Sequence, residues 1–413
     1  MNLRFRFAPA SELPAIAALA RHSFPGGERS PEWWRAQLSD PPYGGGLDSL
    51  FTAEADGRIV GMLQLHPLRQ WIAGELLPTA GIGTVAISPV HRQRRVAGAL
   101  MVQALRAAKE RGDVASALYP FRAAFYQKLG YGQAGEVLQY QVPPTALPAS
   151  EERLRVESLE SAAQWREGLA LYNAWAKRQT GQLERGERVW TQLCAGLECA
   201  LFGYRAEHGA LEGYALVTYR SELPRRDRYL EVEELVWTTP AARRGLYGWL
   251  ASLGDQWEQL LLRARSSERL GDWLREPRLP PGAAPPWRLW MPAATLLAGP
   301  MYRLLDLPAA WALRRVAAGE PLAVALDVSD AQLPENHGRS VLELADGLAR
   351  LVREGGARGT LRLDIATLSR LYTGALSPSA ALHAGLLECD RPELLPALDR
   401  ALLLPEPWTF DRF

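Results

Sequence analysis

Residues 84–132 place a strand, a positively charged turn, a long helix, a second strand and a short aromatic helix in one continuous run. The β-branched stretch 84–87 ends just before Pro89, and because proline has no amide hydrogen to donate, strand pairing must stop or splay there. Apolar residues then recur at helical spacing, which predicts a helix that begins near Arg94. The segment therefore predicts an open strand end beside a helix N-terminus.

The turn between this strand and this helix is suited to an anion. The first turn of a helix leaves amides unpartnered, and the helix dipole adds positive potential there. Arg92, Arg94 and Arg95 add more. Taken on the charges alone, a solvated basic helix start is the better interpretation. The strand before the turn and the aromatic segment around Tyr126 after it favour a bound diphosphate instead.

Two separated motifs carry a resemblance to a known family. They are Val85-x-Ile87-x-Pro89-x-x-Arg92-x-Arg94 and Phe125-Tyr126-x-x-Leu129-Gly130-Tyr131. Together with the helix between them they resemble the coenzyme A core of the GNAT N-acetyltransferases. The whole chain resembles the enhanced-intracellular-survival (Eis-type) acetyltransferases, since residues 228–237, 299–306 and 411–413 match that family's central and C-terminal landmarks in order and spacing.

This resemblance implies an α/β (α+β) chain built of two tandem GNAT folds and a third domain. We expect a catalytic GNAT domain at 1–144, a degenerate second GNAT domain at 145–295, and a sterol-carrier-like α+β domain at 296–413. The residues agree, because the proline-rich stretch 143–148 breaks all periodicity. The segment after it repeats the order of the first in outline, but no aromatic segment like that around Tyr126 follows, so we expect its cofactor site to be lost.

One position departs from the family pattern. GNAT turns usually have a glycine three residues after the leading arginine, whereas this chain has Arg95 there and its next glycine is Gly98. A β-carbon is costly where the backbone needs a positive φ. We therefore expect a wider or differently bent loop, which bears on cofactor affinity more than on cofactor identity.

The resemblance also implies that acetyl-CoA is the acetyl donor. It implies that no metal takes part. Transfer of an acetyl group needs a donor for the developing oxyanion and a proton for the departing thiolate. The Ile87 amide is the expected oxyanion donor, and Tyr126 matches the family's general acid. Without the motif, Tyr126 reads as a core aromatic beside Phe125 and Tyr131. The full set expected to bind acetyl-CoA is Val85, Ala86, Ile87, Arg92, Gln93, Arg94, Arg95, Val96, Ala97, Gly98, Phe121 and Arg122.

For the general base, the family precedent is the C-terminal carboxylate, which here belongs to Phe413. The alternative is deprotonation through water, with Asp411 or Glu54 polarising the pocket. Pro405 and Pro407 hold the tail extended, and its aromatic residues favour docking over fraying. The acceptor side is expected to be lined by Phe24, Trp33, Trp34, Thr84 and Asp411.

These roles predict direct transfer, in a ternary complex, to an amine such as an aminoglycoside, a polyamine or a lysine. The alternative function is a lipid or sterol carrier that uses the third domain. The six histidines are scattered and are expected to be structural or solvent-facing.

Composition limits which other kinds of partner and location the protein can have. A net charge of +1 in 413 residues argues against a nucleic-acid partner. No apolar span is long enough to cross a bilayer, so we expect a cytoplasmic protein with no membrane partner. The three cysteines are expected to be free thiols. The fourteen tryptophans suit core packing or a subunit face, and the family resemblance implies a homohexamer.

Overall fold

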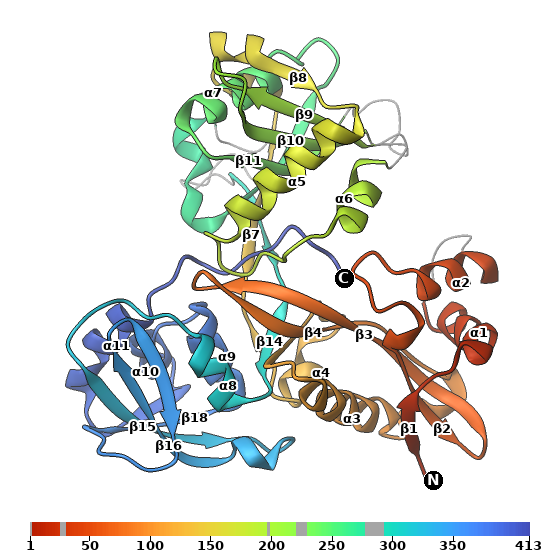
Figure 1. The fold of residues 1–413 in the computed structure, drawn as a ribbon, viewed down its shortest axis with the longest axis vertical. Helices are drawn as coiled ribbons and strands as arrows, with labels where there is room; N and C mark the ends of the chain where they lie inside the picture. Colours follow the sequence, from red (N-terminus) through yellow and green to blue (C-terminus); the bar gives the residue numbers. More distant parts are fainter. Residues whose placement is uncertain (1, 25–29, 196–198, 220–228, 277–292) are drawn as a thin grey trace, which may run out of the picture.

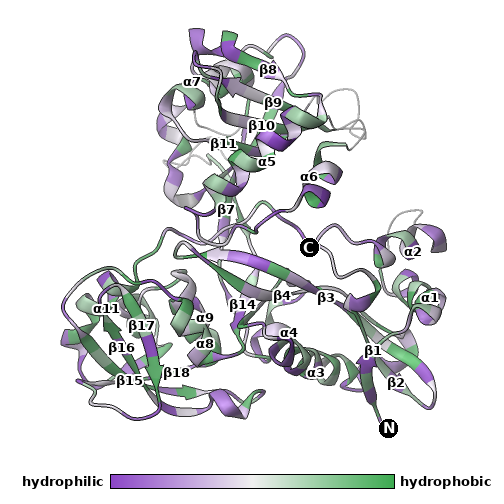
Figure 2. Cartoon of the chain, in the orientation of Figure 1, coloured by the Kyte–Doolittle hydropathy of each residue, from purple (hydrophilic) through white to green (hydrophobic). Residues whose placement is uncertain are grey.

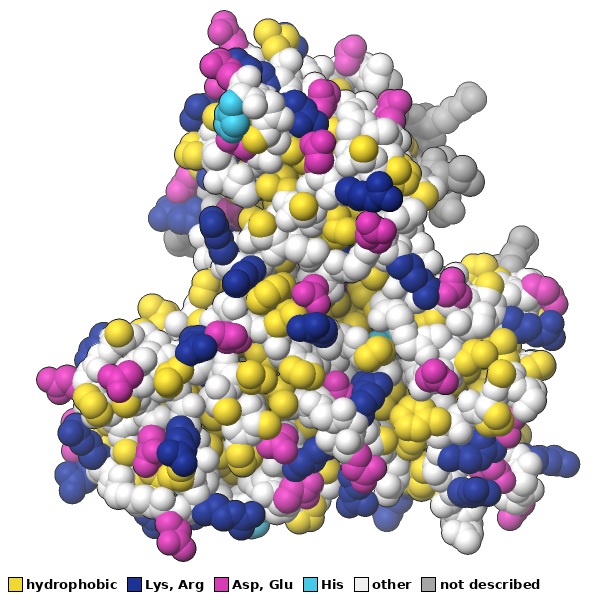
Figure 3. All heavy atoms as spheres, viewed as in Figure 1, with side chains coloured by type: hydrophobic (Ala, Val, Ile, Leu, Met, Phe, Trp, Pro, Cys, Tyr) yellow, Lys and Arg dark blue, Asp and Glu magenta, His cyan; other side chains and the backbone are white. Residues whose placement is uncertain are grey.

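The computed structural model describes residues 2–24, 30–195, 199–219, 229–276 and 293–413. Three β-sheets with their helices form three bodies, which we call the first, second and third domains in chain order (Figure 1). Hydrophobic and hydrophilic residues alternate along the elements of all three (Figure 2). On the face drawn in Figure 3, Lys and Arg side chains are interspersed with Asp and Glu.

The first domain has a seven-stranded sheet in the order β1-β2-β3-β4-β5-β14-β6. Its elements are β1 (Arg4–Phe7), α1 (Leu13–Ser23), α2 (Pro31–Ser39), β2 (Leu50–Ala55), β3 (Arg58–Ile72), β4 (Glu75–Ile87), α3 (Val96–Arg111), β5 (Ala115–Leu118), α4 (Ala123–Gln127), β6 (Gly132–Gln133) and β14 (Met301–Leu304). Only β4 and β5 run parallel. The hairpins turn at Asp56-Gly57 and Ala73-Gly74, where all four residues have positive φ.

The second domain repeats this plan, with strand order β13-β7-β12-β11-β10-β9-β8. Its elements are β7 (Glu136–Val142), β8 (Val156–Ser158), α5 (Ala162–Ala176), α6 (Glu187–Cys194), β9 (Cys199–Arg205), β10 (Leu211–Tyr219), β11 (Tyr229–Trp237), α7 (Pro240–Ala251), β12 (Gln259–Arg265) and β13 (Thr295–Ala298). Here β11 and β12 are the parallel pair. The prediction that this segment repeats the order of the first in outline is confirmed. Arg228 and the proline-rich stretch 277–286 lie outside the described residues.

The third domain has a five-stranded sheet in the order β17-β16-β15-β18-β19. Its elements are α8 (Leu307–Leu313), β15 (Leu322–Ser329), β16 (Gly338–Ala345), β17 (Leu348–Val352), β18 (Thr360–Asp364), α9 (Ile365–Thr373), α10 (Pro378–His383), β19 (Leu387–Cys389) and α11 (Leu395–Leu402). The mixed α/β class with one repeated unit is as predicted.

The chain changes sheet twice close to the expected domain limits. β7 lies within the expected first domain, 1–144, but pairs with β12 and β13 in the second sheet. β14 lies beyond the second domain in sequence but pairs with β5 and β6 in the first sheet. The limits at 144 and 295 stay predictions; the two crossing strands join the first and second domains.

A buried ion pair attaches the third domain to the first. Arg303 of β14 has no solvent-exposed surface and donates two hydrogen bonds of 2.8 Å to Asp330 and one of 2.6 Å to the Leu129 carbonyl. Gly130 has φ +85°, and a Cβ there would lie 1.7 Å from Arg303 Nη1. The glycine of the aromatic motif is therefore required for this packing.

The last nine residues form an extended tail, which we define as residues 405–413. The tail leaves the third domain, passes under the second and ends over β3 of the first (Figure 1). Trp408 donates its amide to the Thr180 carbonyl, and Phe410 stacks on Trp175 at 5.6 Å. The expectation of a docked rather than a frayed tail is met in the structure.

Candidate active site

The parallel strands β4 and β5 separate at their carboxyl ends. Their pairing runs only from Thr79–Ala115 to Ile82–Leu118, after which β4 continues to Ile87 without β5. A β-bulge follows on the other side of β4: Gly83 faces Gln64 and Ala86 faces Met62, so Thr84 and its neighbour oppose a single residue. Thr84 has φ +49° and donates a 2.8 Å hydrogen bond to Gln64 Oε1. The bulge bends the strand away and opens a splay.

The Ile87 amide points into this splay. Ser88 donates to the Val60 carbonyl at 2.9 Å, and Ile87 stands opposite Gly61. Hydrogen-bonded and non-hydrogen-bonded pairs alternate along an antiparallel ladder. The Ile87 amide and carbonyl are therefore directed away from β3, and the carbonyl accepts a hydrogen bond from Ser23 Oγ there.

The turn after β4 is an exposed cluster of cations. Arg92, Arg94 and Arg95 are exposed, and none forms an ion pair within the part of the chain that the structure describes. Gln93 and Arg95 have φ of +61° and +62°, so the left-handed conformation is kept without glycine, at a cost of about 1–2 kcal/mol per residue. Arg95 is the N-cap of α3, and the first amides of α3 complete an anion site.

The remaining predicted acetyl-CoA residues lie around the same end of the sheet. Val96 is buried at the start of α3, whereas Ala97 and Gly98 are partly exposed, and a Cβ at Gly98 would meet open space. Phe121 is 75% exposed and Arg122 is the N-cap of α4. The exposed surfaces of Ala97, Gly98 and Phe121 are therefore accessible to a ligand.

Tyr126 is held in a cage of aromatic rings. Its centroid lies 5.0 Å from that of Phe125, 5.7 Å from that of Phe121 and 6.1 Å from that of Tyr131. The ring is buried and belongs to the apolar cluster that Ile87 also packs against. Burial raises the pKa of Tyr126 to about 12. The phenol is therefore protonated at neutral pH, as a general acid must be.

The tail brings the carboxylate of Phe413 to the bulge. A Cβ built on Gly83 would lie 3.5 Å from the carboxyl carbon of Phe413 and 3.1 Å from His66 Nε2. The Phe413 ring packs against Tyr119 at 5.6 Å and Tyr43 at 6.1 Å. The terminal carboxylate thus lies next to β4, one residue before Thr84.

Asp411 anchors this arrangement from inside the protein. Its side chain is fully buried and accepts hydrogen bonds from Arg185 Nε at 2.8 Å and from the hydroxyls of Tyr43 and Tyr172, each at 3.2 Å. Arg185 in turn binds Glu234 through both terminal nitrogens, at 3.0 and 2.6 Å. Asp411 therefore faces the second domain.

Three of the five residues expected on the acceptor side, Phe24, Trp33 and Trp34, lie at the C-terminus of α1 and the N-terminus of α2. Phe24 and Trp33 are 36% and 37% exposed, whereas Trp34 is buried. Trp34 packs 5.5 Å from Phe24 and 5.0 Å from Trp33. Because Ser23 bonds to Ile87, Phe24 follows directly beside the splay. Glu54, the other acid considered, pairs with Arg6 at 3.0 Å.

Sequence reasoning missed several residues around the tail, namely Tyr43, His66, Tyr119, Arg185 and Glu234. Tyr119 follows β5 directly and donates a 2.6 Å hydrogen bond to the Asp411 carbonyl. His66 is buried, and its burial lowers its pKa to about 4. A signal was present for Glu234, since a carboxylate in the apolar strand 229–237 must have a partner when buried.

The described residues contain no helix that is both long enough and apolar enough to cross a membrane. They also contain no group of three or more His, Cys, Asp or Glu side chains placed to hold a metal. Three tryptophans of the second domain pack within it: Trp190 is buried, Trp249 lies 4.4 Å from Phe202, and Trp257 stacks on Tyr219.

The lipid-carrier alternative is not favoured. The interior of the third domain is filled by a large apolar cluster in which Trp311 and Tyr372 pack edge to face at 5.2 Å. Arg314 is also buried there and donates to the carbonyls of Tyr372 and Leu402. A cavity of about 240 Å³ in this domain is lined partly by charged residues, including Glu320, Arg358 and Arg400.

Comparison with solved structures supports the fold. A GCN5-related N-acetyltransferase from Anabaena variabilis superposes with a TM-score of 0.86 at 22% identity, and Eis1 from Mycobacterium abscessus with a TM-score of 0.78 at 20% identity. Both matches cover 100% of each chain. The alignments show that the three-domain architecture is shared.

Comparison of sequences identifies the family. Residues 4–134 and 181–304 match models of an acetyltransferase (GNAT) domain, and residues 307–410 match a sterol carrier protein domain. N-acetyltransferase Eis of Mycobacterium tuberculosis is 30% identical over 417 residues, 95% of each chain, and an uncharacterized N-acetyltransferase of Streptomyces griseus is 28% identical over 83% of each. The predicted resemblance is confirmed, and the chain belongs to the Eis-type GNAT N-acetyltransferases.

Proposed function

We propose that this N-acetyltransferase moves the acetyl group of acetyl-CoA directly to an amine in the first domain. The position of the Phe413 carboxylate carries the proposal, because it lies beside the β4 bulge next to Gly83. A carboxylate there is placed to take a proton from an amine that enters past Phe24. The acceptor is an aminoglycoside, a polyamine or a lysine side chain.

The cations and free amides around the splay between β4 and β5 suit acetyl-CoA. The exposed cations Arg92, Arg94 and Arg95, with the first amides of α3, suit its diphosphate. The Ile87 amide, which no strand partner uses, is directed to where negative charge develops on the thioester oxygen.

The remaining residues move two protons. The carboxylate of Phe413 accepts the proton that the attacking amine must lose, and the Tyr126 hydroxyl gives its proton to the departing thiolate. Burial favours this direction, since it keeps the Tyr126 phenol in its protonated form. Both residues form their part of the site without a metal.

One molecule of acetyl-CoA is expected per chain. In the second domain, Thr239 Oγ1 accepts the Ala242 amide at 3.2 Å and Pro240 occupies the first position of α7. Proline thus removes one amide of this helix start and Thr239 occupies another, so α7 has fewer free amides than α3. We also propose that the enzyme is cytoplasmic and homohexameric, on the family resemblance.

A thiol-release assay tests this function. Acetyl-CoA is incubated with the enzyme and, in turn, an aminoglycoside, a polyamine and a lysine peptide, and acetylated products are identified by mass spectrometry. Amine-dependent thiol release with one acetyl-CoA bound per chain in isothermal titration supports the proposal. Release without an acetylated amine, or no release with any of the three, contradicts it.

A further inference from the structure

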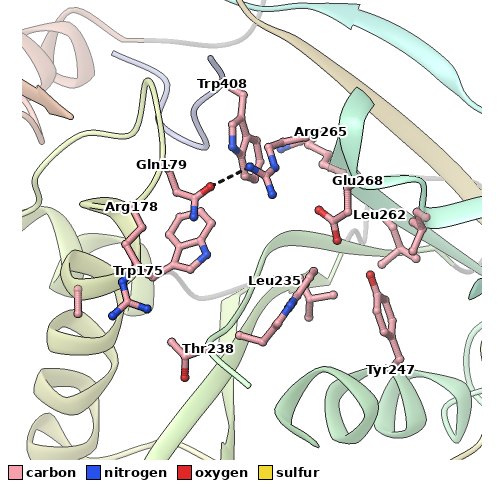
Figure 4. A pocket seen from close by; sticks show the side chains of 14 residues that line it. Trp175, Arg178, Gln179, Leu235, Thr238, Tyr247, Leu262, Arg265, Glu268 and Trp408 are labelled. Carbon is pink, nitrogen blue, oxygen red and sulfur yellow. Dashed lines mark hydrogen bonds between the residues drawn. The ribbon is translucent and has the colours of Figure 1, made fainter. Parts of the chain in front are cut away.

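The second domain keeps the strand splay that the first domain uses for its substrate. β11 and β12 pair only from Tyr229–Gln259 to Val232–Leu262 and then separate. A cavity of about 360 Å³ opens where they part (Figure 4). Its walls come from both strands, from Tyr247 of α7, from the end of α5 and from Trp408 of the tail. The acetyl transfer proposed above uses none of this cavity.

This cavity does not suit a nucleotide thioester. The capped start of α7 offers no diphosphate cradle. Arg243, one turn into α7, is folded over aromatic rings, with its guanidinium carbon 3.8 Å from the ring centroid of Trp273 and 5.0 Å from that of Trp237. A ligand of this space is therefore smaller than acetyl-CoA and has no diphosphate.

Part of the wall is flat and apolar. Figure 4 shows Trp175 and Trp408 on one side of the space, with Leu235, Leu262 and Tyr247 on the other. Trp408 and Trp175 stand edge to face at 6.0 Å. Aromatic faces of this kind favour a planar ring over a flexible chain.

Two buried hydrogen-bond donors on the wall have no acceptor. Trp408 is 4% exposed, and its indole Nε1 has no hydrogen-bond partner. The buried Nε of Arg265 also has none, although its Nη1 donates to Gln179 Oε1 at 3.1 Å. The two groups lie at the same end of the cavity (Figure 4). Buried donors without acceptors are costly, so this end is suited to an acceptor group.

The charges of the lining favour a negative acceptor. Arg178 is exposed at the rim and forms no ion pair among the described residues. Arg263 is neutralised by Glu233, at 2.7 Å, and by Glu231. The one lining carboxylate, Glu268, faces Arg243 at 3.8 Å, and burial raises its pKa. Arg243 and Arg265 both act on the one carboxylate, Glu268, and Arg178 adds a further positive charge, so positive charge exceeds negative charge around the cavity.

We propose that this cavity binds a small aromatic carboxylate, with its ring against the wall that Trp175 and Trp408 form and its carboxylate on Arg265 and Trp408. A carboxylate accepts from the Arg265 Nε and the Trp408 indole at once, which satisfies both orphaned donors. The site lies in a different domain from the β4 splay, so it is separate from the acetyl-transfer site.

Isothermal titration of the full-length enzyme, saturated with acetyl-CoA, tests this site. The probe is indole-3-acetate, and indole-3-acetamide is its neutral isostere. We expect one indole-3-acetate per chain, bound about tenfold or more tighter than the amide. No binding of the acid, or equal affinity for the acid and the amide, would overturn the proposal.

Substitutions locate the site. Arg265→Met is expected to weaken indole-3-acetate binding about tenfold or more, and Arg178→Met, an exposed change that leaves the core intact, to weaken it less. Arg166→Met is the matched control, since Arg166 is an exposed arginine of α5 paired with Glu187 outside the cavity. Affinity that is unchanged in Arg178→Met, or that falls equally in Arg166→Met, would place the probe elsewhere and overturn the assignment.

Discussion

Arg185 and Asp411 form a buried ion pair that joins the second domain to the tail, with Arg185 Nε 2.8 Å from Asp411 Oδ1. The two side chains are 1% and 0% exposed. Removing one partner of such a pair costs about 3–5 kcal/mol, because the other charge stays buried. This pair therefore fixes where the chain end lies, although neither residue is placed to touch the acetyl group.

Asp411→Asn should release the tail and lower turnover about tenfold or more while the three domains stay folded. Steady-state turnover and thermal unfolding measured together check this. The matched control is Arg412→Ala, since Arg412 is 62% exposed and only 3.8 Å from Glu233, a pair worth little in solvent. Equal losses in the two variants would show that the buried pair does not hold the tail.

Extension of the chain beyond Phe413 should remove the terminal charge from the site and keep every side chain. Turnover is expected to fall about 10²–10⁴-fold, while acetyl-CoA affinity and thermal unfolding stay as in the native protein. A self-cleaving fusion that releases Phe413 with a free carboxylate is the control and should restore turnover. Full activity of the extended protein would leave the carboxylate without a catalytic role.

Tyr126→Phe removes only the phenolic hydroxyl from a buried ring. Turnover should fall about 10²–10⁴-fold with acetyl-CoA affinity unchanged, as measured by thiol release and titration calorimetry. Because the active form is the protonated phenol and its pKa is raised to about 12, ionisation of Tyr126 should reduce native activity only as the pH approaches 12. Unchanged turnover in the variant, with chemistry rate-limiting, would leave Tyr126 a core aromatic.

Gly83→Ala should displace the chain end. Its Cβ would lie 3.1 Å from His66 Nε2 and 3.5 Å from the Phe413 carboxyl carbon, in a packed interior that resists added volume. We expect slower turnover with acetyl-CoA affinity retained, by the same two assays. Gly356→Ala is the control, since a Cβ there meets nothing within 4 Å. Native turnover in Gly83→Ala would argue against a carboxylate base beside β4.

Ile87→Pro and Ala86→Pro should separate catalysis from strand pairing. Ala86 belongs to a hydrogen-bonded pair with Met62, so proline there removes a ladder bond and should lower thermal stability. The Ile87 amide is not used by β3, so proline there removes no ladder bond and should lower stability only through the lost packing of the Ile87 side chain, while it abolishes turnover. Native turnover in Ile87→Pro would contradict the oxyanion role, and melting curves of both variants show whether the register argument holds.

Local sequence determined the elements and their order. The Asp56-Gly57 turn, the Ser30 cap that accepts the Trp33 amide, and the helix after Arg95 all form where short-range chemistry requires them. The two motifs around Arg92 and Tyr126 also indicated the family, because their residue types and spacing are read within one continuous segment. Such features depend on neighbours in the chain, which the sequence states directly.

Tertiary structure decided which sheet each strand joins and what holds the tail. The residue patterns of β7 and β14 do not specify a partner strand, so only packing placed β7 in the second sheet and β14 in the first. In the sequence, Asp411 is only a polar residue near the chain end. In the fold it is buried and paired with Arg185, which lies 226 positions away. Register and burial depend on contacts between distant residues, and therefore only the folded chain could bring the Phe413 carboxylate to β4.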